Sequence, residues 1–524
     1  MKRLGLIVAV LAVASALSAQ APTGVDPSAL GRPATTSWPT YNGDYSGRRF
    51  STLTQINTNT VKGLSLAWSY RASAGGAIKG TPLQVDGVMY LTNPDHAWAI
   101  DARTGRELWH FAWTSKGGIH IGNRGGAIVG DAFYFETPDC HLIALNIKDG
   151  TERWHKEICD LDQFYYGSVA PVIVKNHLIT GVSGDDLDVP GYLDARDPAT
   201  GELQWRWYAV PLKMGDPGSE TWPNEDAMKH GGGMTWQPIT YDPELNLIYV
   251  TTGNPQPVIA HANRKGDNLF TGSIVALNAD TGKMAWYFQS SPHDTHDWDS
   301  TQTAVVFDGV FNGQPRKLIA QAARNGHFFV LDRTNGKALI STEYVKTNWA
   351  MGYDEKSGQP IPNPAKMPQI AGALVSPNQG GATNWPPPSF SPATGLFYVS
   401  ASRAFSVYYV YDPSDNPQGW GGTDRGSYTE SMIQAIDYKT GKLRWTHRWE
   451  GNPRSGLLST AGNLLFAGGP SSDIVALNAT TGDAIWHAGL NASVSNGPIT
   501  YELDGLQYLV VSASDTLWAF VLNK

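Results

Sequence analysis

The sequence predicts an all-β fold, because its composition, its turn signals and an internal repeat all favour short strands. The 524 residues include 56 glycines, 33 prolines and 19 tryptophans. This composition is typical of many tight turns between short strands that pack around large aromatic side chains. A motif of the form D-x-x-T-G followed by tryptophan recurs along the chain, as in "AIDARTGRELW" and "ALNADTGKMAW". Repeated sheets bury their faces when they are arranged radially, so the repeat predicts an eight-bladed β-propeller with tryptophan-containing motifs.

Residues 1–21 have the pattern of a secretory signal peptide. Lys2 and Arg3 precede the apolar run "LGLIVAVLAVASAL", and small residues follow it in "SAQA". The run is shorter than a typical membrane span, and an N-terminal anchor is the alternative interpretation. We therefore expect export to the periplasm and no transmembrane segment. No linker or shift in composition divides residues 22–524, which we expect to form a single propeller domain.

Each copy of the repeat predicts two strands joined by a tight turn. Alternating apolar residues form a strand, the D-x-x-T-G segment turns with glycine at positive φ, and a second strand ends in tryptophan. Six copies end in a tryptophan, namely Trp109, Trp154, Trp205, Trp286, Trp445 and Trp486. A degenerate copy ends at Ile340, and Trp68 marks an eighth position without a preceding hairpin. We expect each tryptophan to pack against a neighbouring blade.

The spacing of the copies predicts where the ring closes and where it carries insertions. The C-terminal "QYLVVSASDTLWAFVL" is expected to complete the blade that begins near Trp68. The intervals from Trp205 to Trp286 and from Ile340 to Trp445 are longer than the others. Insertions in a propeller gather at one mouth of the ring, where binding sites form, so these two intervals are expected to build the site.

The two cysteines flank a predicted hairpin that turns at residues 148–150. If the turn is centred near residues 149 and 150, Cys140 and Cys159 fall opposite one another across two strands. An oxidising compartment favours a disulfide between them, and two buried thiols are the alternative.

Two further observations exclude whole classes of function. Lysine and arginine number 39 against 47 aspartates and glutamates, a net charge of −8, which provides no basic face for nucleic acid. The chain has no C-x-x-C-H motif, so it binds no c-type haem of its own.

A set of motifs in fixed order resembles a known family. The motifs are "NRG", "GGGMTW", "YDPELNLIYVTTGNP", "PHDTHDWDS", "ARNGHFFVLDRTNG", "GGATNWPPPSFSPATGLFYV" and "GLLSTAGNLLFAGG". Over nearly all of residues 22–524 the chain resembles the pyrroloquinoline quinone (PQQ)-dependent alcohol dehydrogenases, eight-bladed quinoproteins that include methanol and ethanol dehydrogenases. The resemblance implies a periplasmic enzyme that oxidises an alcohol by hydride transfer to metal-bound PQQ. It also implies a separate c-type cytochrome as electron acceptor, and it allows a homodimer.

The resemblance implies which residues bind the quinone. Trp236 stands where the family stacks an indole against the cofactor, and planar guanidinium groups suit carboxylate and carbonyl oxygens. The alternatives are one more core tryptophan and arginines in surface ion pairs. The implied cofactor-binding residues are Lys79, Arg124, Ser168, Ser183, Trp236, Arg324 and Asn384.

The resemblance assigns chemistry to the acidic segment "SPHDTHDWDS". Asp297 is implied as the catalytic base, with Arg324 beside it. The implied metal-binding residues are Asp186, Asn254, Asp297 and Asp299. Asp299 stands where lanthanide-using members carry an extra aspartate, and three carboxylates favour a lanthanide(III) ion over Ca²⁺. The alternatives are a solvated turn for Asp299 and an ordinary acidic turn at residues 185–188.

Three positions depart from the family pattern. Gly118 and Ile119 stand where many members carry two adjacent cysteines over the quinone. Lys79 replaces a frequent glutamate, and Arg454 replaces a tryptophan near the carboxylated edge of the quinone. A cation at residue 79 is electrostatically favourable for a cofactor carboxylate. A non-catalytic propeller scaffold of the cell envelope is the alternative function.

Overall fold

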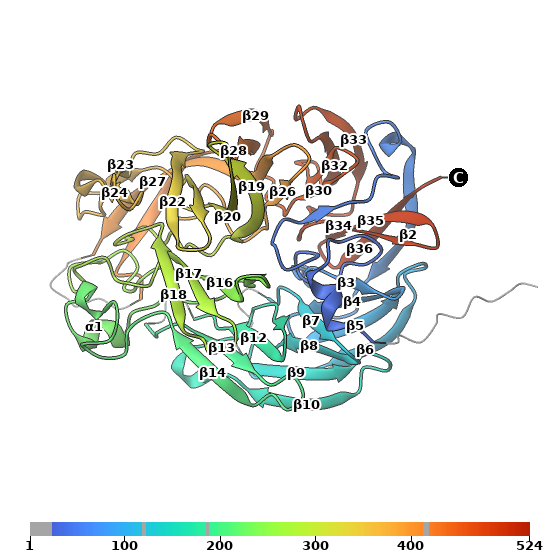
Figure 1. The fold of residues 1–524 in the computed structure, drawn as a ribbon, viewed down its shortest axis with the longest axis horizontal. Helices are drawn as coiled ribbons and strands as arrows, with labels where there is room; N and C mark the ends of the chain where they lie inside the picture. The colour runs from blue at the N-terminus through green and yellow to red at the C-terminus, as the bar shows by residue number, and fades with distance from the viewer. Residues whose placement is uncertain (1–23, 118–121, 185–187, 412–418, 524) are drawn as a thin grey trace, which may run out of the picture.

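The computed structural model describes residues 24–117, 122–184, 188–411 and 419–523. Within these ranges, eight sheets of four or five strands lie around a ring, and a two-stranded sheet lies at its edge (Figure 1). The helical segments of the described residues are short, and α1 (Glu225–Lys229) is the α-helix among them. The predicted all-β, eight-bladed propeller is therefore confirmed.

Five sheets are each made of four consecutive antiparallel strands. The first three comprise β3 (Leu83–Val85), β4 (Val88–Asn93), β5 (His96–Asp101) and β6 (Glu107–Ala112); β7 (Gly126–Val129), β8 (Ala132–Glu136), β9 (His141–Asn146) and β10 (Glu152–Glu157); and β11 (Val172–Val174), β12 (His177–Gly181), β13 (Tyr192–Arg196) and β14 (Leu203–Tyr208). The next two comprise β15 (Thr240–Asp242), β16 (Leu247–Thr251), β17 (Ser273–Asn278) and β18 (Met284–Gln289); and β19 (Val305–Phe311), β20 (Gln314–Ala322), β21 (His327–Asp332) and β22 (Lys337–Glu343).

The other sheets carry additions to this pattern. The sixth contains β25 (Ala373–Val375), β26 (Ser389–Ser391), β27 (Leu396–Val410), β28 (Gly422–Asp437) and β29 (Leu443–Arg448). The seventh contains β1 (Phe50–Ser51), β30 (Leu458–Thr460), β31 (Leu464–Gly468), β32 (Asp473–Asn478) and β33 (Ala484–Gly489). The edge hairpin is β23 (Ala350–Tyr353) with β24 (Pro360–Pro362), and the 3₁₀ helices are η1 (Pro27–Gly31), η2 (Val61–Gly63), η3 (Leu161–Gln163), η4 (Ser219–Thr221) and η5 (Pro364–Lys366).

The eighth sheet closes the ring with strands from both ends of the chain. It contains β34 (Ile499–Leu503), β35 (Leu506–Ala513), β36 (Thr516–Leu522) and β2 (Leu64–Arg71). β2 pairs antiparallel with β36, from Leu64 opposite Leu522 to Arg71 opposite Thr516. The predicted closure by the C-terminal strand is confirmed.

The repeat tryptophans connect neighbouring blades, as the sequence predicts. The Nε1–H of Trp205 donates to the carbonyl oxygen of Ala279 in the next blade at 3.1 Å. A Cβ on Gly282, the turn glycine of that next blade, would lie 2.6 Å from the indole of Trp205. The same contact, at 2.5–2.8 Å, recurs in the pairs Gly105–Trp68, Gly150–Trp109, Gly201–Trp154, Gly336–Trp286 and Gly482–Trp445.

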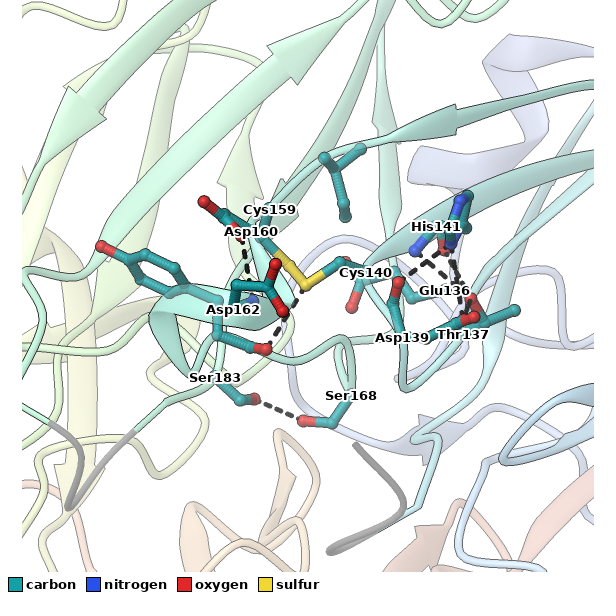
Figure 2. Close-up of a disulfide and its surroundings, with 12 residues drawn as sticks. Glu136, Thr137, Asp139, Cys140, His141, Cys159, Asp160, Asp162, Ser168 and Ser183 are labelled. Carbon is teal, nitrogen blue, oxygen red and sulfur yellow. Dashed lines mark hydrogen bonds and ion pairs between the residues drawn. A yellow bond between two sulfur atoms is a disulfide. The ribbon is translucent and has the colours of Figure 1, made fainter. Parts of the chain in front are cut away.

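The cysteines form a disulfide, which confirms the pairing expected from the hairpin. The Cα atoms of Cys140 and Cys159 lie 5.0 Å apart, at the end of the β9–β10 hairpin (Figure 2). Residues 137–139 join the end of β8 to Cys140, and residues 160–167 join Cys159 to Ser168. The bridge therefore ties together two segments that lead into the site described below.

The two predicted insertions meet around one side chain. Trp298 lies between the fourth and fifth sheets and is 1% exposed. Its ring lies 5.2 Å from that of Trp349, and Tyr408 and Val258 belong to the same apolar cluster. Val258 comes from the first long interval and Trp349 and Tyr408 from the second. The insertions therefore support the segment that carries Asp297 and Asp299.

No described helix is long and apolar enough to cross a bilayer.

Candidate active site

The predicted site residues share one end of successive sheets. In an antiparallel sheet the start of the first strand and the end of the second lie at the same edge. Among the described residues, Ser183, Asn254 and Arg324 follow the second strand of a sheet, Asn384 precedes β26, and the following precede the first strand of a sheet: Lys79, Arg124, Ser168, Trp236, Asp297 and Asp299. The fold therefore gathers them at one mouth of the ring.

Arg324 joins the two candidate acids of the segment "SPHDTHDWDS". Its Nη2 lies 2.7 Å from Oδ2 of Asp297, and its Nη1 lies 2.8 Å from Oδ2 of Asp299. The three residues are 5%, 3% and 1% exposed, respectively. The alternative interpretation of Asp299 as a solvated turn residue is therefore wrong. The two carboxylates carry one negative charge more than this guanidinium, and a bound cation or the nearby Arg454 would balance it.

The conformation of this segment depends on Asp294. Its carboxylate accepts hydrogen bonds from the backbone N–H groups of His296, at 3.1 Å, and Trp298, at 2.7 Å. Asp297 between them has a φ of 65°, in the left-handed region that few non-glycine residues adopt. Asp294 thus shapes the turn that presents Asp297, and burial raises the pKa of the Asp294 carboxyl.

Asn254 supplies an oxygen that suits a metal ion. Its backbone N–H donates to Oδ1 of Asp299 at 2.7 Å. Its side-chain Oδ1 is buried and has no hydrogen-bond partner among the described residues. A Cβ on Gly253 would lie 2.7 Å from Oδ1 of Asp299, so glycine allows this close approach. A buried carbonyl oxygen beside two carboxylates is the donor set that a hard cation prefers, and these residues fit a metal ion.

The fourth predicted metal ligand, Asp186, lies outside the described residues. Within the described ranges, no group of three His, Cys, Asp or Glu side chains gathers to hold a metal ion. Asp188, of the same acidic segment, accepts a hydrogen bond from the backbone N–H of Gly419 at 2.6 Å. Residues 118 and 119, where the family cysteines are replaced, also lie outside the described ranges.

Arg124, Ser168 and Ser183 form one buried hydrogen-bonded cluster. Nη1 of Arg124 donates to Oγ of Ser168 at 2.6 Å, and the two serine hydroxyls lie 2.6 Å apart. The guanidinium carbon of Arg124 lies 4.4 Å from the ring centre of Trp236. Trp236 is 6% exposed, and its indole Nε1–H is buried without a partner among the described residues. A cation, two hydroxyls and an indole at one mouth fit a flat acidic ligand.

Two further cations border the site. Partial burial, with a smaller contribution from the charge of Arg124, lowers the pKa of Lys79. Lys79 lines a cavity of about 330 Å³ together with Asn93, Asp95 and Gly122. Burial and the charge of Arg324 lower the pKa of Arg454. Lys79 therefore lies near Arg124 and Arg454 near Arg324, and both cations suit a ligand with several carboxylates.

Asn384 belongs to the loop that wraps around Arg324. Its Oδ1 accepts from the backbone N–H of Trp385 at 2.8 Å, and its Nδ2 donates to the carbonyl oxygen of Gly380 at 3.1 Å. A Cβ on Gly381 would lie 2.1 Å from Cγ of Arg324, so this loop packs directly on the arginine. Asn384 thus fixes the shape of the loop.

Gln379 is a site residue that sequence reasoning missed. Its side-chain Nε2 donates to Oδ2 of Asp297. Its carbonyl oxygen accepts from Nη2 of Arg324 at 2.8 Å and from Nε at 3.2 Å. It therefore contacts both members of the Asp297–Arg324 pair. The two glycines after it are a signal of a close approach, but no local pattern indicates that its amide faces an acid 82 residues away.

Comparison with known proteins matches this chain to one family and this architecture to solved structures. Residues 38–372 match the family model described as glucose/ethanol/alcohol dehydrogenase, β-propeller domain, and residues 429–523 match the model of outer membrane protein assembly factor BamB. Quinoprotein alcohol dehydrogenase PedH of Pseudomonas putida is 38% identical, over 89% of this chain and 84% of its own length.

Two solved structures have the same fold. Quinohemoprotein alcohol dehydrogenase ADHIIG of Pseudomonas putida HK5 superposes with a TM-score of 0.90 and 31% identity, over 96% of this chain and 83% of that one. A europium-containing methanol dehydrogenase superposes with a TM-score of 0.85 and 28% identity, over 93% of this chain and 98% of that one. The family match covers more than half of the chain, and the relatives are aligned over most of their length. The chain belongs to the family of PQQ-dependent alcohol dehydrogenases.

Proposed function

We propose that this enzyme is exported to the periplasm, oxidises an alcohol with PQQ and passes the electrons to a separate c-type cytochrome. The observation that carries the proposal is the buried Asp297–Arg324–Asp299 group beside the unpartnered Oδ1 of Asn254. A propeller scaffold has no need of two buried carboxylates that share one arginine, because such a group costs desolvation energy.

Asp297 acts as the base of the reaction. Its carboxylate takes the hydroxyl proton of the alcohol, and Arg324 at 2.7 Å favours the ionised form that can do so. Gln379 donates to the same Oδ2 and fixes the direction of the carboxylate. When bound, PQQ would accept the hydride of the alcohol carbon at a carbonyl polarised by a metal ion, and the electrons would then leave to the cytochrome.

The residues at the mouth of the ring would each make a different contact with PQQ. Trp236 offers a flat apolar face, and Arg124 with Ser168 and Ser183 offers donors to carboxylate or carbonyl oxygens. Lys79 and Arg454 add positive charge at the borders of the site. Asn384 holds the loop that lies against Arg324.

The metal ion is a lanthanide(III) ion in this proposal. Asn254, Asp297 and Asp299 would hold it together with Asp186, and the third carboxylate raises the negative charge that a trivalent ion prefers. Two findings support this assignment: Asp299 is buried beside Asn254, and one structural neighbour is a europium-containing enzyme.

The test reconstitutes purified apoprotein with PQQ and either Ca²⁺ or La³⁺, and then measures dye-linked oxidation of a panel of primary alcohols. We expect activity with La³⁺ and its loss in Asp297→Asn. Asp299→Ala is expected to lose La³⁺-supported activity selectively, with Asp226→Ala, which replaces an exposed aspartate of α1, as control. Failure to take up PQQ with either metal would overturn the proposed activity. Equal activity with Ca²⁺ in wild type and Asp299→Ala would overturn the lanthanide assignment alone.

A further inference from the structure

Glu136 is a buried acid that has no part in the proposed reaction. It is the last residue of β8 and is 0% exposed. The preceding residues of the strand are alanine and aromatic side chains, in "AFYFE". Burial raises the pKa of this carboxyl to about 8, although hydrogen bonds to it act in the opposite direction. An acid that is buried at such a cost in free energy needs a local reason.

The carboxyl group joins two segments that are distant in sequence from β8. The backbone N–H of Val169 donates to Oε2 at 2.8 Å. The hydroxyl of Thr180, on β12, is hydrogen-bonded to Oε1, and the backbone N–H of Ser168 also interacts with the carboxyl. The carbonyl oxygen of Glu136 accepts from Nδ2 of Asn123 at 2.7 Å. Glu136 therefore connects the turn before β7, the turn before β11 and the middle of β12.

The turn at residues 167–169 packs directly on this acid. A Cβ on Gly167 would lie 2.3 Å from the carbonyl oxygen of Thr137 and 3.3 Å from Oε2 of Glu136. Only glycine allows this approach, so the position of the turn is determined by the end of β8. Figure 2 shows the end of β8, the disulfide and the Ser168–Ser183 pair in one region of the molecule.

Ser168 transmits the position of the turn to the quinone site. Its hydroxyl contacts Nη1 of Arg124 and the hydroxyl of Ser183, each at 2.6 Å. The carbonyl oxygen of Ser168 also accepts from the backbone N–H of Arg124 at 3.2 Å. A shift of residues 167–169 would therefore displace both the cation and the hydroxyls.

We propose that Glu136 is a positioning residue of the quinone site: it fixes Ser168 and, through Ser168, Arg124 and Ser183. The inference rests on the proposed function, because these three residues are the proposed partners of the quinone. The proposal gives Glu136 no direct contact with the quinone, because its hydrogen bonds go to Val169, Thr180 and Asn123.

The experiment titrates apoprotein with PQQ in the presence of La³⁺ and follows the quenching of tryptophan fluorescence. Glu136→Leu keeps the volume of the side chain and removes its oxygens, and we expect Kd to rise about tenfold, the effect of losing one strong hydrogen bond. Glu136→Gln keeps a hydrogen-bonding oxygen and nitrogen, like a protonated carboxyl, and is expected to stay within about twofold of wild type. Glu355→Leu, at an exposed site near the β23–β24 hairpin, is the control and should bind as wild type does.

A double-mutant cycle separates positioning from a loss of stability. If Glu136 acts through Ser168, Glu136→Leu should weaken binding much less in a Ser168→Ala background than in wild type. Thr180→Val removes only the hydrogen bond between the Thr180 hydroxyl and Oε1 of Glu136. We expect a threefold or larger rise in the Kd for PQQ, with an unchanged circular dichroism spectrum.

The outcomes distinguish this inference from the proposed function. A wild-type protein that takes up no PQQ with La³⁺, nor with Ca²⁺ in a parallel titration, overturns both. Wild-type affinity in folded Glu136→Leu overturns the inference alone, as does an undiminished effect in the Ser168→Ala background. If Glu136→Leu does not fold, Thr180→Val decides, and wild-type affinity in that variant overturns the inference.

Discussion

At the scale of single residues, Gln379 provides a direct test of how Asp297, the proposed base, is held. Gln379→Leu removes the hydrogen bond to Oδ2 of Asp297 and keeps the size of the side chain. A hydrogen bond to a charged group contributes about 1.5–3 kcal/mol. We therefore expect kcat to fall about tenfold or more, with a smaller change in KM, because the base and not the binding site is disturbed.

The control for this measurement lies on the strand that leads to Arg324. Gln314→Leu changes the same residue type at the exposed start of β20 and should leave kcat unaltered. Steady-state kinetics of the reconstituted enzyme check both variants. A Gln379→Leu enzyme with wild-type kcat would show that Arg324 alone suffices to orient Asp297.

The raised pKa of Glu136 predicts a pH dependence of stability. The carboxyl has an ordinary pKa of 4.5 in the unfolded chain and a pKa of about 8 in the fold. Between these values the folded state holds a proton that the unfolded state has lost, so the free energy of unfolding falls as pH rises. This contribution has a slope of about 1.4 kcal/mol per pH unit at most.

Glu136→Gln removes the titrating group, so the free energy of unfolding of this variant should not fall with pH by the contribution of Glu136. Urea unfolding of the apoprotein at pH 5, 6.5 and 8 measures the difference between wild type and variant. Wild type should lose stability relative to the variant at each step. Parallel curves for the two proteins would show that Glu136 is ionised in the fold throughout this range.

Sequence reasoning identifies the residues of the site better than the contacts between them. The resemblance to the family points to Asp297, Asp299, Arg324 and Asn254, and the structure brings these residues together. Gln379 and Glu136 are missed because their partners lie 82 and 33–44 residues away. Such contacts depend on how separate turns meet at one mouth of the ring, and no local pattern encodes that meeting. Asp186, expected from the same resemblance, remains a prediction.

At the scale of the elements, the turn glycine of each blade has two functions that can be separated by mutation. Gly282 has a φ of 66°, and a Cβ there would lie 2.6 Å from the ring of Trp205 in the preceding blade. Gly313 has a φ of 75°, and a Cβ there would meet no heavy atom within 4 Å. Gly313→Ala therefore tests the backbone strain alone, which costs about 1–2 kcal/mol.

Gly282→Ala should be more destabilising than Gly313→Ala. The additional loss comes from displacing Trp205, and overpacking of this kind costs about 1–3 kcal/mol. Thermal unfolding of the two variants gives the comparison. Equal losses would mean that the indole moves aside freely and that the contact between blades contributes little.

The repeat makes the blades predictable because each copy encodes its own strand, turn and strand. The alternation of apolar residues and the D-x-x-T-G turn are local signals, and the tryptophan reports the contact with the next blade. The long strands β27 and β28 and the β23–β24 hairpin are expected from the sequence only as an insertion of unknown form. Their structure depends on packing around Trp298 rather than on a repeated motif.

At the scale of the whole molecule, closure of the ring joins all blades into one unit. β36 lies between β2 and β35, so the eighth sheet is completed by strands from both ends of the chain. In an open array of repeats, removal of a terminal strand costs roughly the stability of one repeat. In a closed ring, the same removal exposes the faces of the first and last blades together.

Deletion of residues 516–524 should therefore abolish the folded state instead of lowering its stability by a small step. The deletion removes every pair between β2 and β36, from Leu64–Leu522 to Arg71–Thr516, and exposes buried residues such as Leu509 and Trp68. Deletion of Lys524 alone is the matched control and should leave the melting temperature unchanged, because β36 and the hydrogen bonds of Asn523 to Ser65 and Gly63 are kept. Circular dichroism and size-exclusion chromatography provide the measurement. A folded monomer with a slightly lower melting temperature after the longer deletion would show that the blades stabilise one another only through nearest neighbours.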